Sequence, residues 1–246
     1  MRLSVLFSVV LVLAGRALGE DLTLKIPPLK TSFQAGGQTI PVTAWGTLSG
    51  AAAGALRLAF TADLSGLQAN ITPLLQAELN RSDRCGERLS VDHAVLGPSD
   101  PVAVLTVNLR YERWACAKVF GKQAVKRLVG GNGVVLVALM PSTGPEGIGM
   151  VAEVKKIDAD GSLGEVLRSG SMGASVKEKI ATSIQNAIRK SLDLKAALPA
   201  SVGAAATFES ARFVNGPGGH LWISVGAALH LSADEVQALA RQMQPH

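Results

Sequence analysis

The chain of 246 residues has few charged and few aromatic side chains. Charged residues make up 17% and aromatic residues 4%, whereas an ordinary soluble domain has about 25% charged residues. Two of the 24 Lys and Arg residues lie in the first 19 positions, so the remainder carries 22 minus 19, or +3. This small charge argues against nucleic acid as a partner, because nucleic acid requires a clustered basic face. With 48% hydrophobic residues, the chain buries much of itself or keeps apolar surface for a partner.

Recognisable catalytic motifs are also missing. No HExxH, CxxC or HxH pair occurs, so a zinc site would have to be assembled from scattered residues. The run Ser169-Gly170-Ser171-Met172-Gly173 fails the GxSxG pattern of a nucleophile elbow, because a serine stands where the first glycine belongs. We interpret it as a loop that leads into a helix. We therefore expect no catalytic residues, no cofactor and no enzymatic activity.

Two further polar features have ordinary structural interpretations. Residues 158–165 resemble a fragment of a calcium loop, but the twelfth position is Ser169 where the loop needs glutamate. A turn after a strand is the better interpretation, and no metal site is predicted. His93 alternates with apolar residues of a predicted strand, which favours a buried structural histidine over a general base.

The longest apolar run lies at the N-terminus. Arg2 precedes apolar residues 3–14, and Ala17 and Gly19 occupy the small-residue positions of a cleavage site. We predict a signal peptide over 1–19 and an exported protein, periplasmic or secreted. An uncleaved membrane anchor is the alternative, although the run is shorter than the roughly 18–20 residues that a spanning helix needs.

The chain has two cysteines, Cys85 and Cys116, and an oxidising compartment favours one disulfide between them. The predicted strands Arg88–Leu96 and Val102–Trp114 form a hairpin that brings the two cysteines roughly opposite each other. In the alternation of side chains along the strands, Cys85 falls on the apolar face of its strand and Cys116 does not. The bridge between them therefore needs a one-residue register shift. We predict a β-bulge near Arg113–Ala115. Two unpaired thiols are the alternative.

Hydrophobic periodicity predicts an α+β fold. Pro73 is expected to confine a helix within Gly66–Asn80 to a start near Thr72, and Lys118–Val129 is expected to be a short helix or an irregular crossing before a break at Gly130–Gly133. Strands are predicted at Leu22–Ile26, Thr39–Leu48, Ala55–Asp63, Val134–Met140, Ile148–Ile157, Thr207–Val214 and His220–Leu231, and further helices at Ser175–Leu194 and Ser232–Met243. The expected architecture is one long curved antiparallel sheet packed on one long amphipathic helix, plus a C-terminal helix. Short connections favour a single domain over 20–246.

This order of elements resembles the tubular lipid-binding (TULIP) superfamily. The resemblance rests on the hairpin Leu89–Trp114, the strand pair Val134–Ile157 and the helix Ser175–Leu194 followed by Pro199. In that superfamily such a sheet wraps the helix and leaves an apolar groove for acyl chains. The resemblance therefore implies a groove between sheet and helix in this chain.

We expect the protein to bind a lipid or another apolar ligand. The alternative is a non-enzymatic envelope scaffold or assembly partner that presents a sheet edge or the basic segment Lys118–Arg127 to another protein. The small positive charge also permits weak attraction to an anionic membrane surface. A hydrolase with a dispersed site, built around His93, ranks third. The predicted ligand-lining residues are apolar side chains of the two central strands and the long helix: Val135, Val137, Leu139, Ile148, Met150, Ile180, Ile184 and Ile188.

Overall fold

The computed structural model describes residues 23–35, 37–50, 56–80, 85–119, 122–144, 147–191 and 206–229. The predicted signal peptide 1–19 and the predicted C-terminal helix Ser232–Met243 lie outside the described residues. The single domain predicted for 20–246 stays a prediction.

The described strands form two antiparallel sheets, so the expectation of one long sheet packed on one long helix is wrong. About 70% of the described residues are in strands and 25% in helices, and the strands form a five-stranded sheet A and a four-stranded sheet B. Sheet A has the order β1-β2-β3-β9-β8, with β1 (Thr23–Ala35), β2 (Gln38–Gly50), β3 (Leu56–Asp63), β8 (Ala206–Asn215) and β9 (Leu221–Leu229). Sheet B has the order β4-β5-β6-β7, with β4 (Gly86–Ser99), β5 (Val102–Val119), β6 (Lys122–Gly144) and β7 (Gly147–Ala159).

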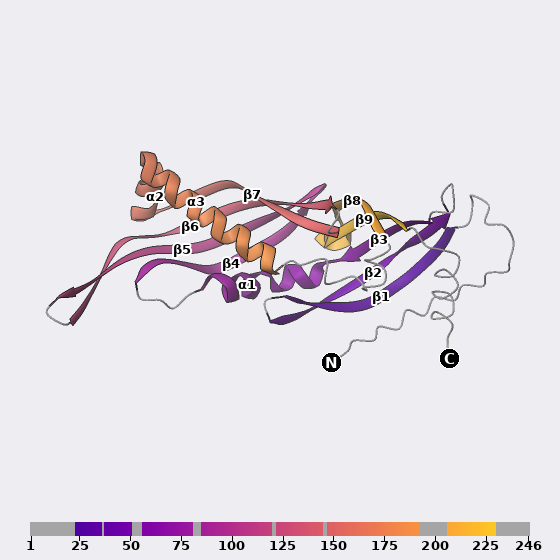
Figure 1. Cartoon of the computed structure of the whole chain (residues 1–246), viewed down its shortest axis with the longest axis horizontal. Helices are drawn as coiled ribbons and strands as arrows, with labels where there is room; N and C mark the ends of the chain where they lie inside the picture. Colours follow the sequence, from indigo (N-terminus) through magenta and orange to yellow (C-terminus); the bar gives the residue numbers. More distant parts are fainter. Residues whose placement is uncertain are drawn as a thin grey trace.

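The pairing of β3 with β9 explains the second sheet. It joins the N-terminal strands to the predicted C-terminal hairpin, which is present as β8 and β9. Periodicity identifies a strand and its buried face, but it does not identify the strand beside it. Figure 1 shows the consequence: an elongated molecule with sheet A towards one end and sheet B towards the other.

The α-helices of the described region all lie against sheet B or at its junction with sheet A (Figure 1). They are α1 (Ser65–Leu79), α2 (Gly161–Arg168) and α3 (Gly170–Ser191). The helix predicted at Ser175–Leu194 is present as α3, which begins five residues earlier than predicted and is described as far as Ser191. Helix α2 was not predicted, and the predicted loop Ser169–Gly173 lies mostly within α3.

Sheet B buries one of its two faces. In β5 the buried residues alternate strictly with less buried ones, the pattern of a strand with one face against a core. This inner face is continuous with the interior of sheet A, because one cluster of buried residues contains Leu105 and Val137 of sheet B together with Ile40 and Val225 of sheet A.

Helix α1 begins at Ser65, seven residues before the predicted start, and contains Pro73 in its interior. A proline inside a helix costs about 3 kcal/mol. Each fully buried leucine or isoleucine stabilises the fold by about 1.5–3 kcal/mol, so the burial of the helix's apolar stripe outweighs the proline. The buried stripe consists of Leu67, Ile71, Leu74, Leu75 and Leu79.

The polar side of α1 satisfies the free edge of β4. Thr72 Oγ1 donates to the carbonyl of Ala94 and accepts from its N–H, both at 2.9 Å. Asn80 Oδ1 accepts from the N–H of Val91 at 2.6 Å. Gln68 connects the two sheets, because its Nε2 donates to the Leu96 carbonyl of β4 and its Oε1 accepts from the backbone of β9. Since these side chains recur every fourth residue on one helix face, α1 covers an edge that would otherwise expose unpaired backbone groups.

Strand β6 continues through the glycine run where a break was expected. A Cβ atom at Gly131 would lie 2.5 Å from the Asp160 carbonyl oxygen and 2.8 Å from Leu163 Cβ. The glycine therefore allows the start of α2 to pack closely on the strand. Within the segment Lys118–Val129, residues 118–119 belong to β5 and residues 122–129 to β6, so the predicted helix or irregular crossing is also wrong for the described residues.

A register shift in β4 places His93 on the outside. Asp92 is the extra residue between the pairs Val91–Leu109 and His93–Asn108. Beyond this bulge Ala94 takes the inner face and His93 is exposed, which contradicts the prediction of a buried histidine.

The predicted disulfide between Cys85 and Cys116 is present. The bulge predicted near Arg113–Ala115 is wrong for this hairpin, because β4 pairs regularly with β5 at that level. A register shift occurs instead in the pairing of β5 with β6, between Arg113 and Trp114, where Leu128 of β6 is the extra residue. Cys85 precedes β4, and the next residue, Gly86, has a φ of 87°, which glycine adopts readily. Because the chain turns at Gly86, Cys85 lies outside β4, and the direction of its side chain does not follow the alternation of the side chains in that strand.

We predict that Cys85→Ala/Cys116→Ala lowers the free energy of unfolding by about 3–4 kcal/mol, from the entropy of closing a loop with a cysteine separation of 31 residues. Denaturant unfolding with and without reductant measures the loss. Reductant should destabilise the wild type by a similar amount and leave the double variant unchanged. A wild-type midpoint that does not respond to reduction contradicts the prediction.

Candidate functional site

Sheet B brings most of the predicted lining residues together. Val135, Val137 and Leu139 project from β6 into the interior with no exposed surface. Ile148 and Met150 follow on the inner face of β7, and Ile180 of α3 is 1% exposed in the same cluster. Ile184 and Ile188 belong to α3, but the structure does not describe their side chains. Five of these residues belong to the buried cluster and Met150 packs against it, and whether they contact a ligand stays a prediction.

Burial of the inner face decreases towards β7. The inner residues of β5, from Ala103 to Tyr111, are at most 2% exposed. The inner residues of β7 beyond Ile148 are only partly buried: Met150, Ala152, Val154, Ile157 and Ala159. An apolar seam, defined by these five residues, therefore runs along the edge of the sheet.

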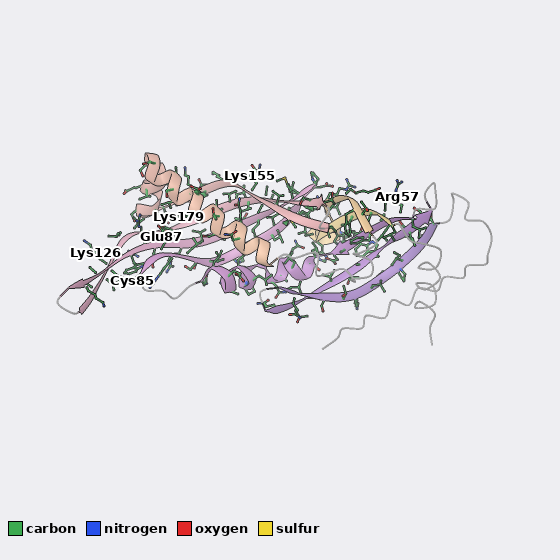
Figure 2. The ribbon with its side chains drawn as sticks, viewed as in Figure 1. Arg57, Cys85, Glu87, Lys126, Lys155 and Lys179 are labelled. Carbon is green, nitrogen blue, oxygen red and sulfur yellow. A yellow bond between two sulfur atoms is a disulfide. The ribbon has the colours of Figure 1, made fainter. Side chains whose placement is uncertain are left out.

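Helix α3 crosses the inner side of sheet B and packs against the seam (Figure 1). Two polar contacts hold it at opposite edges of the sheet. Lys179 Nζ lies 2.8 Å from Glu87 Oε1, at the start of β4. Both residues are labelled in Figure 2. Gln185 Nε2 donates to the Ala152 carbonyl of β7 at 2.9 Å. Val176 and Ile180 are the buried hydrophobic side chains of the described part of this helix.

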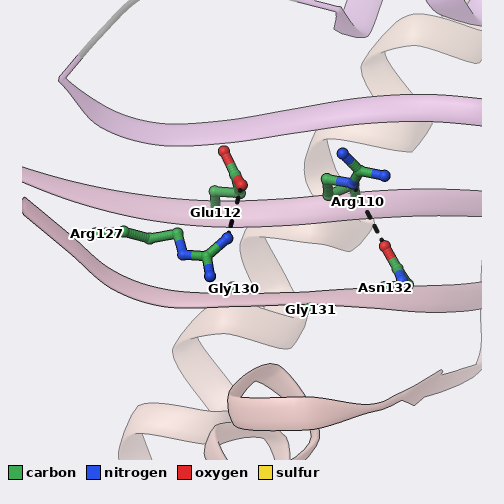
Figure 3. Close-up of a pocket in the computed structure, with 6 residues that line it drawn as sticks. All are labelled: Arg110, Glu112, Arg127, Gly130, Gly131 and Asn132. Atoms are coloured by element: carbon green, nitrogen blue, oxygen red, sulfur yellow. Dashed lines mark hydrogen bonds and ion pairs between the residues drawn. The ribbon is translucent and has the colours of Figure 1, made fainter.

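A polar pocket of about 270 Å³ lies on β5 and β6, near the end of sheet B where β4 begins. Figure 3 shows two cross-strand pairs that frame it. Arg127 donates to Glu112 Oε1 at 3.2 Å, and Arg110 Nε donates to Asn132 Oδ1 at 3.4 Å. The pocket's lining is Arg110, Glu112, Arg127, Gly130, Gly131 and Asn132, which includes none of the predicted ligand-lining residues.

Trp114 and Arg127 control the ionisation of Glu112. Trp114 Nε1 donates to Glu112 Oε2 at 3.0 Å, and this hydrogen bond, with a smaller contribution from Arg127, lowers the pKa of Glu112. Arg88 lies over the Trp114 ring at 5.4 Å. The carboxylate thus orders a cationic side chain on the neighbouring strand and an aromatic side chain two residues along its own strand. Sequence reasoning missed the contribution of Arg127, because its strand was not predicted.

Polar groups singled out as catalytic or metal-binding are used in structural contacts. His93 Nδ1 lies 3.4 Å from Thr72 Oγ1. Asp160 Oδ1 accepts from the N–H of Asn132 at 2.8 Å, which ties the start of α2 to β6. Among the residues that the structure describes, no group of three or more His, Cys, Asp or Glu side chains is placed to hold a metal ion.

Comparison with known proteins gives no relative. No protein-family model, curated protein or solved structure matches this chain. The likeness to the tubular lipid-binding superfamily and the predicted export stay predictions. No helix within the described ranges is long and apolar enough to cross a membrane.

The buried Tyr111 gives a direct probe of the inner face, because it is the only tyrosine of the chain. Burial raises its pKa to about 12, and the negative charge of Glu87 contributes further. The neutral phenol therefore stabilises the fold fully below pH about 10, the pKa of an unfolded tyrosine. This contribution is lost as the pH rises through 12.

We predict that ultraviolet titration of the folded protein finds tyrosinate only near pH 12, while the protein in denaturant titrates near pH 10. Glu87→Gln should lower the pKa of Tyr111 but leave it above the unfolded value, because burial is the larger cause. Circular dichroism at each pH confirms that the chain is still folded. An ordinary pKa in the folded state would show that water reaches this end of the inner face.

Proposed function

We propose that the protein binds a lipid or another apolar ligand between α3 and the inner face of sheet B. The observation that carries the proposal is the uneven burial of this face: β5 is sealed, whereas the seam from Met150 to Ala159 remains partly open. Apolar surface that stays accessible beside a buried core is typical of a ligand or partner site.

The length of the seam fits an acyl chain. Its nine residue steps span about 30 Å at ~3.3 Å per residue. The hydrocarbon core of a bilayer has a similar thickness and contains two acyl chains end to end. The seam is therefore long enough for one fully extended acyl chain.

The attachment of α3 would permit entry of such a chain. The side chain of Lys179 is 53% exposed in its pair with Glu87, and exposed ion pairs contribute about 0–1 kcal/mol. Among the contacts of the described side chains of α3, displacing the helix from the seam breaks one weak ion pair and one hydrogen bond to Ala152, while Val176 and Ile180 are its buried apolar side chains.

The second candidate is a protein-binding scaffold. The outer face of sheet B carries exposed apolar side chains, namely Val95 at 53%, Val134 at 42% and Val151 at 48%. An antiparallel sheet with one face on the core normally has a polar outer face, so these side chains favour a partner on that side. The expectation of no enzymatic activity stays a prediction.

The first test is mass spectrometry of an organic extract from protein purified without detergent from its native compartment. The proposal predicts a lipid in stoichiometric amount. A clean extract, repeated after incubation with membrane lipids, contradicts it and favours the scaffold.

A matched pair of variants tests the location. Met150→Trp places a large ring on the seam, whereas Val151→Trp places the same ring on the outer face one residue away. Loading with a fluorescent fatty acid should fall at least several-fold in the first variant and be unchanged in the second. Equal effects would place the ligand elsewhere.

A further inference from the structure

Strands β5 and β6 extend beyond the rest of sheet B. Strand β4 begins at Gly86, opposite Trp114, but β5 and β6 remain paired as far as Val119 and Lys122. We call Trp114–Val119 with Lys122–Arg127 the β5–β6 finger. It projects from the end of the molecule opposite to sheet A (Figure 1).

The finger exposes both of its faces. Consecutive residues from Ala124 to Leu128 are all exposed, whereas a strand with one face on a core alternates. Val125 is 43% and Leu128, just past the finger, 53% exposed. A two-stranded ribbon is only marginally stable by itself, and the Cys85–Cys116 disulfide fixes its base.

All ionisable charges of the finger's strands have the same sign. They contain Lys118, Lys122, Lys126 and Arg127 and no Asp or Glu, and the nearest acid along β5 is Glu112. Residues that pair across the strands lie on the same face, so the register places Lys118 and Lys126 on opposite faces. Positive charge therefore surrounds the ribbon.

We propose that the β5–β6 finger binds the surface of an anionic lipid bilayer. The lysines on both faces meet lipid phosphates, and Val125 enters the interfacial layer between headgroups. This role goes beyond binding in the seam and does not depend on it, because the finger and the seam share no residue.

The size of the finger favours a bilayer over a protein partner. Five residue steps give a length of about 17 Å, and two strands give a width of about 10 Å. The two faces together offer roughly 340 Å², well below the ~800 Å² per partner of a stable protein interface. A fluid layer of anionic headgroups can surround both faces without a matching shape, and like charges on the ribbon strengthen this attachment.

Vesicle co-sedimentation tests the proposal with the full chain. Wild-type protein should bind vesicles of phosphatidylcholine with a minor share of phosphatidylglycerol, and binding should fall as salt screens the charges. Each basic residue near an anionic surface strengthens binding about fivefold, so Lys118→Gln/Lys126→Gln should bind about 30-fold more weakly. Thermal unfolding of each variant confirms that it folds.

The control variant Lys25→Gln/Arg57→Gln removes two positive charges from exposed positions on sheet A. Figure 2 shows Arg57 and Lys126 at opposite ends of the molecule. The control should bind as tightly as wild type. The proposal is overturned if wild type does not bind, if it binds pure phosphatidylcholine vesicles equally well, or if both variants lose the same affinity. Failure of the organic extract to yield lipid leaves this result unaffected, so the two proposals fail separately.

Discussion

The rest of the structure depends on the burial of one face of sheet B. Five residues of β5, from Ala103 to Tyr111, project into the same interior and are at most 2% exposed. A sheet with one apolar face must pack that face against another layer. Sheet A, α1 and α3 supply the layer, and the buried cluster connects them. The elongated form follows, because the two sheets share this interior only where they meet.

The two edge strands of sheet B, β4 and β7, differ in how many of their backbone groups the helices cover. Side chains of α1 pair with the backbone of β4 at Ala94 and Val91, so this edge is closed. At β7 the described part of α3 gives one such bond, from Gln185 to Ala152. The partly buried seam lies on this more open side, which is why the proposed ligand site is there and not beside β4.

Local sequence patterns predicted the parts of the fold that depend on neighbouring residues. The disulfide and the two strands β8 and β9 are confirmed. Predictions failed where a contact distant in sequence decided the outcome. The β3–β9 pairing created the second sheet, and packing of α2 explains Gly131 within a strand. A single bulge residue, Asp92, was enough to turn His93 outwards. The pairing of Glu112 with Arg127 could not be found, because it required the register of an unpredicted strand.

The central claim is that α3 is a displaceable cover over a sealed sheet, and hydrogen exchange followed residue by residue tests it most directly. The account predicts that the amides of β5 exchange most slowly, that those of α3 exchange faster through local opening, and that loading with lipid slows α3 while leaving β5 unchanged. Exchange in α3 as slow as in β5, with no response to lipid, would contradict the claim and identify the helix as a fixed part of the core.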